Sequence, residues 1–314
     1  MNIVSTVQLS DENIEYIYSK THERVSYIDK MISSLMSIEN IEILLARDRD
    51  ITISLLEEMI SLKMIFIVST GVEKIPFKYL QERNIMVANT TGVSEEAMSN
   101  YVIGALLSFS SNFLNCFHYK NQRHWQKYLC TEPLVEKKLL ICGAGKIGRK
   151  IAEKAKAFKI RTIGIKTKIE QVSYFDEIYD MTAFEKQLRE ADYTVCCLPL
   201  TKQTYKLFNA NVFSMMKQSS VFINISRGGL VDEDALIVAL EDNQIKGAVL
   251  DVFETEPLPK ESKLWDLDNV ILTPHSSGRI HNFLDYSIHC FCNNLISYKT
   301  TGRLVSPIDL DKGY

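Results

Sequence analysis

The chain has 314 residues, of which 46% are hydrophobic, and a formal net charge of −3. This length predicts about two domains of ordinary size, and the slightly negative charge gives no electrostatic reason to expect nucleic acid or an anionic membrane surface as a partner. The sequence shows no apolar run near the ~20 residues that span a membrane and no secretion signal at its start. We therefore expect a cytoplasmic protein.

The seven cysteines do not have the spacing of metal ligands. Cys196 and Cys197 are adjacent, and Cys290 and Cys292 are one residue apart, whereas zinc sites use C-x-x-C pairs. We expect buried free thiols in a reducing compartment and no metal site.

In the first third of the chain, short apolar runs alternate with amphipathic segments, a pattern that indicates a parallel sheet with connecting helices. One such helix is expected at 52–60, with Leu55, Leu56 and Ile60 on one face. The strands expected here are 41–47, 62–69 and 85–90.

Residues 94–117 form the longest helical pattern, with Ser94 as the expected N-cap, and we expect this helix to bridge two domains. A second series of strands and helices begins at 136–158, and the chain from about Ile280 is again helical. The later strands expected in this series are 193–200, 220–226, 245–253 and 269–274.

A glycine motif, Gly143-Ala144-Gly145-Lys146-Ile147-Gly148, follows the apolar strand LLIC directly and opens a helix. The first glycine permits a tight turn, the second lets the backbone approach a pyrophosphate, and the third lets helix and strand pack closely. The helix N-terminus then faces the phosphates. The motif in this position predicts a dinucleotide site.

Polar side chains follow the later strands, and ligands of open α/β sheets bind outside those carboxyl ends. Arg227 follows one strand, Asp251 and Glu256 follow the next, and His275 follows the last. An arginine can hold a carboxylate by two hydrogen bonds, and a histidine beside a carboxylate can exchange a proton near neutral pH. Singly, each is more often a surface or loop residue; together, at successive strand ends, they favour an active site. The remaining histidines are expected to be structural or at the surface: His22, His118, His124, His281 and His289.

The series GAGKIG, LPLT, NISRGGLVDEDAL, LDVFETEP and TPH resembles the family of D-isomer-specific 2-hydroxyacid dehydrogenases over most of the chain. The resemblance implies two doubly wound parallel-sheet α/β domains, with a Rossmann nucleotide-binding domain inserted into a flavodoxin-like substrate domain. The implied substrate-binding domain is 1–98 with 280–314, and the implied NAD(P)-binding domain is 99–279. It also implies a homodimer formed through the nucleotide-binding domain.

The resemblance assigns the catalytic roles to three residues. Arg227 would bind the carboxylate and keto oxygen of the substrate, and His275 would be the acid/base. Glu256 would pair with His275 and keep its proton available. Asn100 stands where many members of the family have an acid, which weakens any role for that position.

The same resemblance assigns binding roles. Backbone amides of Gly71 and Val72 would bind the substrate carboxylate, and Asp251 would hold the nicotinamide carboxamide. The other residues expected at the cofactor are Gly143, Gly145, Lys146, Ile147, Gly148, Lys166, Thr167, Leu198, Pro199 and Ile225.

The implied reaction is hydride transfer between a nicotinamide cofactor and a 2-keto acid/D-2-hydroxy acid pair. Formate dehydrogenase, a relative on the same scaffold, is disfavoured because it has an amide where this chain has Glu256. A non-catalytic NAD(H)-sensing corepressor of the same fold remains open, since such proteins can retain the catalytic residues.

The strand at 161–165 ends in Lys166, Thr167 and Lys168, with no acid. Lys166 lies 18 residues beyond Gly148, near the position, roughly 20 residues on, where NAD-specific sites place the acid that binds the ribose. A cation there can pair with a 2′-phosphate but cannot accept a hydrogen bond from a ribose hydroxyl. We therefore expect NADP(H) to be favoured over NAD(H), the alternative being that Lys166 points into solvent and NAD is used weakly.

Overall fold

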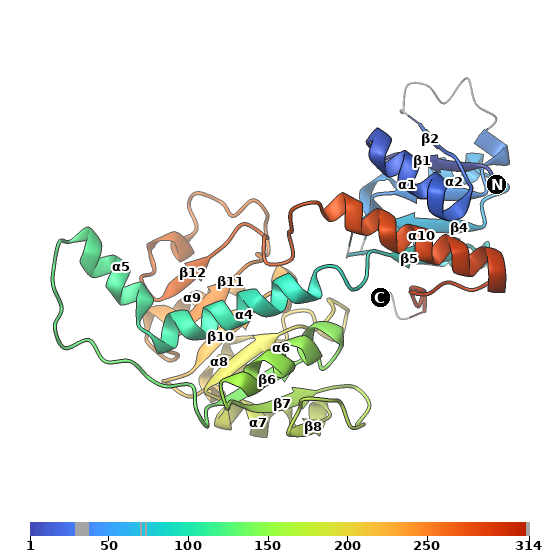
Figure 1. The fold of residues 1–314 in the computed structure, drawn as a ribbon. Helices are drawn as coiled ribbons and strands as arrows, with labels where there is room; N and C mark the ends of the chain where they lie inside the picture. Colours follow the sequence, from blue (N-terminus) through green and yellow to red (C-terminus); the bar gives the residue numbers. More distant parts are fainter. Residues whose placement is uncertain (29–37, 70, 73, 312–314) are drawn as a thin grey trace. The chain divides into compact units, whose positions relative to one another are not determined.

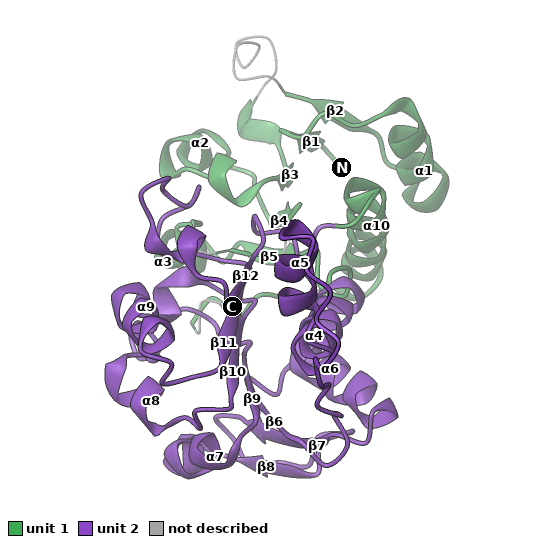
Figure 2. Cartoon of the chain, turned by 90° about the vertical axis from the view of Figure 1, so that its left-hand side faces the viewer, with its two compact units in different colours: residues 1–94, 280–314 green, residues 95–279 purple. Residues whose placement is uncertain are grey.

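The computed structural model describes residues 1–28, 38–69, 71–72 and 74–311. The chain divides into two compact units, Met1–Ser94 with Ile280–Tyr314 (unit 1) and Glu95–Arg279 (unit 2), coloured separately in Figure 2. Each unit has one sheet of parallel strands, with helices packed on its two faces (Figure 1). This confirms the predicted fold class of two doubly wound α/β folds.

Unit 1 contains a five-stranded sheet in the order β2-β1-β3-β4-β5. Its strands are almost wholly apolar because both faces are covered: Leu44 and Ile65 pack in one hydrophobic cluster, and Leu45 and Phe66 in another on the opposite face. The elements are β1 (Ile3–Ser5), α1 (Asp11–Thr21), β2 (Val25–Tyr27), β3 (Ile43–Ala46), α2 (Ile53–Glu58), β4 (Met64–Ile67), α3 (Phe77–Glu82), β5 (Met86–Asn89) and α10 (Phe283–Thr301).

Unit 2 contains a seven-stranded sheet in the order β12-β11-β10-β9-β6-β7-β8. The strand order reverses beside β6, so the crevice between the ends of β6 and β9 is the switch point at which such sheets bind ligands. The elements are α4 (Glu95–Ser110), α5 (Phe113–Asn121), β6 (Lys138–Cys142), α6 (Lys146–Ala157), β7 (Arg161–Ile165), β8 (Glu177–Tyr179), α7 (Phe184–Glu190), β9 (Tyr193–Cys196), α8 (Ala210–Met215), β10 (Val221–Asn224), α9 (Glu233–Glu241), β11 (Gly247–Leu250) and β12 (Val270–Leu272).

The long helix expected at 94–117 is two helices, α4 and α5. They are separated because Asn112 adopts the left-handed backbone conformation (φ 56°), which asparagine tolerates better than most residues. All of α4 belongs to unit 2, and the predicted boundary at 98/99 falls inside this helix. The assignment of unit 1 as the substrate-binding domain and unit 2 as the cofactor-binding domain stays a prediction.

Two smaller expectations were wrong. Ile60 lies beyond the end of α2 and is 73% exposed, so it does not share the buried face of Leu56. All seven cysteines are free, but Cys116 and Cys130 are exposed because they lie on α5 and on the segment that follows it. The other thiols include Cys196, whose pKa burial raises to about 12.

Candidate active site

The glycine motif forms a tight turn between β6 and α6. The backbone N–H groups of Gly143 and Ala144 both donate to the carbonyl of Ile165, at 3.0 and 3.1 Å, so the turn lies against the end of β7. Gly143 has φ +109°, and a Cβ there would lie 2.6 Å from the carbonyl oxygen of Cys197. At Gly148 a Cβ would lie 2.2 Å from the carbonyl oxygen of Gly143. These two glycines are therefore required by the fold of the turn itself.

Gly145 differs from its neighbours, because nothing lies within 4 Å of where its Cβ would be. It is the N-cap of α6, and the first N–H groups of a helix have no partner within the helix. The turn thus leaves open space in front of a helix N-terminus, with Lys146 and Ile147 as the first helical residues. This arrangement fits the pyrophosphate of a dinucleotide.

Lys166 follows β7 directly and is 32% exposed, so it does not point wholly into solvent. Its ammonium group forms an ion pair with Glu170, four residues on. This pair, together with the charge of Lys168, holds the pKa of the Glu170 carboxyl below its usual value. Thr167 is exposed beside it. The ammonium group at the end of β7 is therefore already paired with an acid of the following loop.

One hydrogen bond joins the segments that follow β9 and β10, and another holds the segment after β9 in place. The Ser226 hydroxyl donates to the carbonyl of Leu198, and the Thr204 hydroxyl donates to the carbonyl of Pro199 at 2.7 Å. Ile225 is buried at the end of β10, where it packs in the core on one face of the sheet. These contacts set the wall of the crevice beside the glycine turn.

Arg227 begins the turn after β10. The buried Asn224 side chain brackets this turn: its amide nitrogen donates to the Arg227 carbonyl at 3.0 Å, and its oxygen accepts the Ser226 N–H at 3.1 Å. One guanidinium nitrogen of Arg227 donates to the Ser226 carbonyl at 2.7 Å. Next to it, a Cβ at Gly228 would overlap the backbone of Phe253, so the Arg227 turn is packed against the loop that carries Glu256.

His275 and Glu256 lie close together. Nδ1 of His275 is 2.8 Å from Oε2 of Glu256, and the other carboxylate oxygen accepts the Phe253 N–H at 3.1 Å. The side chains are 45% and 35% exposed, so a small molecule can reach the imidazole. A carboxylate at Nδ1 fixes the tautomer and the orientation of the ring. The Nε2 atom is left to act on a ligand.

Asp251 directly follows β11 and is completely buried. Its carboxylate accepts the N–H groups of Ser276 and Ser277, each at 2.8 Å, and the hydroxyl of Thr273. The Asp251 carboxylate therefore holds the loop that contains His275. Its contact with a nicotinamide carboxamide stays a prediction.

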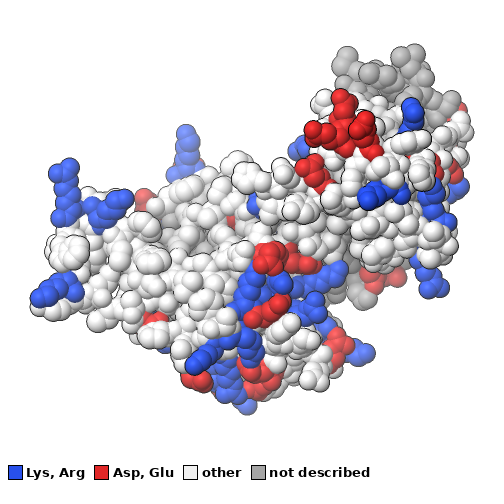
Figure 3. Space-filling model, viewed as in Figure 1, with Lys and Arg blue, Asp and Glu red and all other residues white. Residues whose placement is uncertain are grey.

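Asn100, at the position where an acid was expected from many members of the family, is part of a charged network on α4 and α6. Lys154 binds the Asn100 side-chain oxygen and, at 2.5 Å, the carboxylate of Glu96. Lys150 pairs with Glu96 and Glu153 at 3.4 and 3.0 Å. Figure 3 shows such mixed positive and negative side chains around α6. Asn100 thus serves as an acceptor for a lysine in this surface network.

Gly71 and Val72 lie in unit 1, apart in the chain from every other predicted site residue. The Gly71 carbonyl accepts the Ser69 hydroxyl at 2.7 Å, and Val72 is buried in the core of unit 1. Their proposed contact with a substrate remains a prediction, because it depends on the placement of unit 1 beside unit 2.

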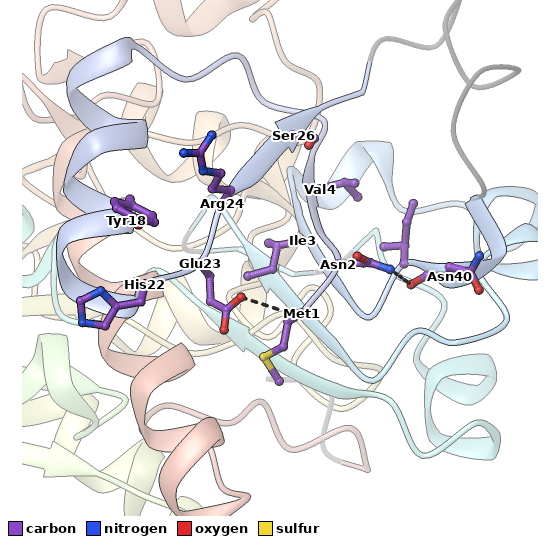
Figure 4. A pocket seen from close by; sticks show the side chains of 11 residues that line it. Met1, Asn2, Ile3, Val4, Tyr18, His22, Glu23, Arg24, Ser26 and Asn40 are labelled. Carbon is purple, nitrogen blue, oxygen red and sulfur yellow. Dashed lines mark hydrogen bonds and ion pairs between the residues drawn. The ribbon is translucent and has the colours of Figure 1, made fainter.

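A cavity of about 570 Å³ in unit 1 contains none of the predicted site residues (Figure 4). The amino group of Met1 and Lys299 both pair with Glu23, and the Arg24 guanidinium lies over the Tyr18 ring. The Glu23 carboxylate of this cavity is therefore already paired with two cations, and the Arg24 guanidinium lies over an aromatic ring.

Within the described residues, no cluster of His, Cys, Asp and Glu side chains has the arrangement of a metal site. No helix in that part of the chain is both long and apolar enough to cross a bilayer.

Comparison with known proteins identifies the class. Residues 103–277 match the family model described as "D-isomer specific 2-hydroxyacid dehydrogenase, NAD binding domain". The chain is 30% identical over 270 residues to a glyoxylate reductase of Korarchaeum cryptofilum, covering 81% of this chain and 80% of the relative. The chain belongs to the D-isomer-specific 2-hydroxyacid dehydrogenase family. The predictions of family, of enzyme class and of an NAD(P) cofactor are thereby confirmed.

Solved structures agree. A D-isomer-specific 2-hydroxyacid dehydrogenase family protein from Aeromonas salmonicida is 31% identical, with a TM-score of 0.82 and 98% of each chain covered. An NADPH-dependent glyoxylate/hydroxypyruvate reductase from Sinorhizobium meliloti, solved with NADP and sulfate, shares the fold with a TM-score of 0.85 at 23% identity, covering 100% of this chain and 99% of that one.

Sequence reasoning missed three residues that hold the site together: Asn224, Thr273 and Glu170. The first two are polar residues at strand ends, which is the signal that selected Arg227 and His275. Glu170 gave only a weaker signal, because it is an acid that lies four residues beyond Lys166, the position at which a ribose-binding acid would be expected.

The glycine turn gives a test that separates folding from cofactor binding. Gly148→Ala is expected to destabilise the protein, by about 1–3 kcal/mol, since backbone must move to admit the methyl group. Gly145→Ala is expected to keep the wild-type unfolding temperature but to weaken dinucleotide binding, because its methyl group projects where the pyrophosphate would lie. Thermal unfolding and titration with NADPH measure the two effects; equal losses of stability in both variants would contradict the assignment.

The pair of His275 and Glu256 gives a second test. His275→Gln is expected to abolish turnover while dinucleotide binding survives, because the glycine turn needs no imidazole. Glu256→Gln is expected to lower kcat with dinucleotide binding unchanged, because the amide no longer holds Nδ1 of His275 as the carboxylate does. Steady-state kinetics measure both, and a His275→Gln variant with wild-type kcat would remove His275 from the mechanism.

Proposed function

We propose that this chain reduces a small 2-keto acid to the D-2-hydroxy acid, with unit 2 as the NAD(P)-binding domain and unit 1 as the substrate-binding domain. The observation that carries the proposal is the His275–Glu256 pair at 2.8 Å. It lies at the same edge of the sheet as the Arg227 turn and the glycine turn, because all these strands are parallel. The relative from Korarchaeum cryptofilum is named a glyoxylate reductase, which supports a small 2-keto acid as substrate.

The roles of the protein groups follow from their chemistry. When bound, the reduced nicotinamide supplies the hydride. His275, protonated and with Nδ1 held by Glu256, gives the Nε2 proton to the substrate oxygen as negative charge develops there. General acid catalysis of this kind contributes about 10²–10⁴-fold. Arg227 orients the substrate through its carboxylate and stabilises the oxygen, and the backbone amides of Gly71 and Val72 bind the same carboxylate.

The cofactor preference depends on Lys166. Its backbone is fixed beside the glycine turn, since the preceding carbonyl of Ile165 accepts both N–H groups of the turn. A 2′-phosphate would replace Glu170 as the partner of Lys166, with Lys168 and the Thr167 hydroxyl nearby. The Lys166–Glu170 pair is exposed, so it is worth little and is readily exchanged. We infer that NADPH is favoured over NADH.

A homodimer and a cytoplasmic location complete the proposal. Large apolar side chains are exposed on α5 and the segment after it, including Phe117 at 64%, Trp125 at 89% and Tyr128 at 79%. Such a concentration is typical of a surface that a partner covers. Seven free cysteines suit a reducing compartment.

The test of function is a panel of 2-keto acids, assayed by loss of NADPH and NADH absorbance. We expect turnover of at least one small 2-keto acid. A protein that binds NADPH but turns over none of the panel would instead be a dinucleotide-sensing binding protein.

The same assay tests the cofactor site. Lys166→Asp is expected to lower kcat/KM for NADPH by about 10-fold or more, because a charged hydrogen bond is lost and repulsion is gained. Glu170→Gln is expected to raise kcat/KM for NADPH a few-fold, roughly the effect of freeing an exposed lysine from its partner, with NADH unchanged. Wild type that favours NADH, together with a loss of NADH activity in Glu170→Gln, would show instead that Glu170 binds the ribose.

The surface around α5 predicts the oligomeric state. Sedimentation velocity is expected to show a dimer, and Trp125→Ser with Tyr128→Ser is expected to weaken it, because the exposed rings would no longer be buried against a second copy. Val238→Ser, at an exposed position of α9, is the control. A wild-type monomer at micromolar concentration would contradict the dimer.

A further inference from the structure

We propose that Tyr101, Thr273 and Asp251 form a hydrogen-bonded chain that positions the imidazole of His275, which makes Thr273 and Tyr101 positioning residues for the reaction. The inference rests on the acid/base role proposed for His275. It assigns a role to two residues that lie outside the predicted site.

The first step is the backbone of His275. Its φ is +51°, in the left-handed region that residues other than glycine seldom adopt. The direction in which the imidazole points depends on this backbone conformation. A histidine backbone does not favour this conformation without contacts to other residues. Neighbouring contacts must therefore hold it.

Those contacts come from one residue. The N–H groups of His275, Ser276 and Ser277 all donate to Asp251, the first to its carbonyl and the others to the two carboxylate oxygens, each at 2.8 Å. Three consecutive N–H groups thus bind one residue after β11, two of them through its side chain. Moving Asp251 would turn the backbone of His275.

The second step concerns the charge of Asp251. The carboxylate is completely buried, and among the residues that the structure describes no lysine or arginine forms an ion pair with it. A buried carboxylate must then be satisfied by hydrogen-bond donors. The Thr273 hydroxyl is the one side-chain donor that we find on it in the described chain, and it binds the same oxygen as Ser276.

The third step fixes the direction of the chain. Thr273 has one hydroxyl proton, which goes to the carboxylate, so Oγ1 accepts from the Tyr101 hydroxyl, 2.7 Å away. Burial raises the pKa of Tyr101 to about 12, so the phenol keeps its proton at any ordinary working pH. Tyr101 is carried by α4, which packs on the sheet. The order is therefore Tyr101 to Thr273 to Asp251, and from Asp251 to the backbone of 275–277.

The test uses Thr273→Val, which keeps the shape but removes the hydroxyl, and Tyr101→Phe. We expect Thr273→Val to lower kcat by about 10- to 100-fold, the size of effect that a small misplacement of a catalytic group produces, with dinucleotide affinity within about twofold of wild type. Thr273→Ser is expected to recover most of the rate. Tyr101→Phe is expected to lower kcat a few-fold, and the double variant to equal Thr273→Val alone, because Tyr101 acts only through Thr273.

Tyr193→Phe is the matched control: it is a buried tyrosine of unit 2, on β9, whose pKa burial likewise raises to about 12. It is expected to keep wild-type kcat. A Tyr101→Phe effect that adds in full to that of Thr273→Val would overturn the chain, as would a Thr273→Val variant with wild-type kcat.

A readout without turnover separates this inference from the proposed function. In the protein without cofactor, ¹⁵N NMR of the histidine rings is expected to show one defined His275 state in wild type and Thr273→Ser. In Thr273→Val we expect several states or a shifted signal. The His275 signal is assigned by its loss in His275→Gln. If His275→Gln keeps full activity, the proposed mechanism fails; if only the ring signals of Thr273→Val stay unchanged, the positioning chain fails.

Discussion

Seven parallel strands in one sheet determine where the chemistry of unit 2 is located. Because parallel strands all end at the same edge, segments more than a hundred residues apart along the chain meet there: the glycine turn, the Lys166 segment, the Arg227 turn and the His275 loop. Both faces of the sheet are covered by hydrophobic clusters, so the polar side chains at these ends face the crevice edge and not the core. The parallel direction of the strands therefore determines where the site lies, and the residues at the strand ends determine its chemistry.

The crevice has two ends with different physical demands. At the cofactor end, close approach of backbone dominates, and Gly143 and Gly148 are required because the turn leaves no room for a Cβ. At the catalytic end, the main requirement is the orientation of the His275 side chain. His275 adopts an uncommon backbone conformation, and a buried carboxylate holds the loop that carries it. Such a carboxylate is costly to bury unless hydrogen-bond donors satisfy it, and three donors bind this one.

The charge pattern at β7 connects structure to cofactor choice. An acid at this strand end would repel a 2′-phosphate; here the acid, Glu170, lies four residues later and is bound to Lys166. In the free protein the charges of Lys166 and Glu170 neutralise each other. Neither NADH nor NADPH therefore meets an unpaired charge of this pair that would repel it. The cofactor preference then depends on whether NADPH or NADH replaces the Lys166–Glu170 ion pair with the more favourable contacts.

The sequence alone determined a good deal of this protein. Alternating apolar and amphipathic segments predicted two parallel α/β folds, because strands covered on both faces must be apolar along their length. The glycine spacing located the turn, and polar residues after strands located Arg227 and His275, since these signals are local. Three of the three-residue strands that the structure describes, β1, β2 and β8, gave too little pattern to be recognised, whereas β12, of the same length, was expected.

Tertiary structure decided the rest. The division of the helix at Asn112 depends on a single backbone conformation, and the exposure of Cys116 and Cys130 depends on what packs over α5 and the segment after it. Thr273 and Tyr101 are 172 residues apart and meet because α4 packs beside the sheet. Asp251 looked in the sequence like a residue for the cofactor alone, and the structure shows it also holding the His275 loop. Contacts of this kind arise from packing between distant segments, which no local pattern of residues records.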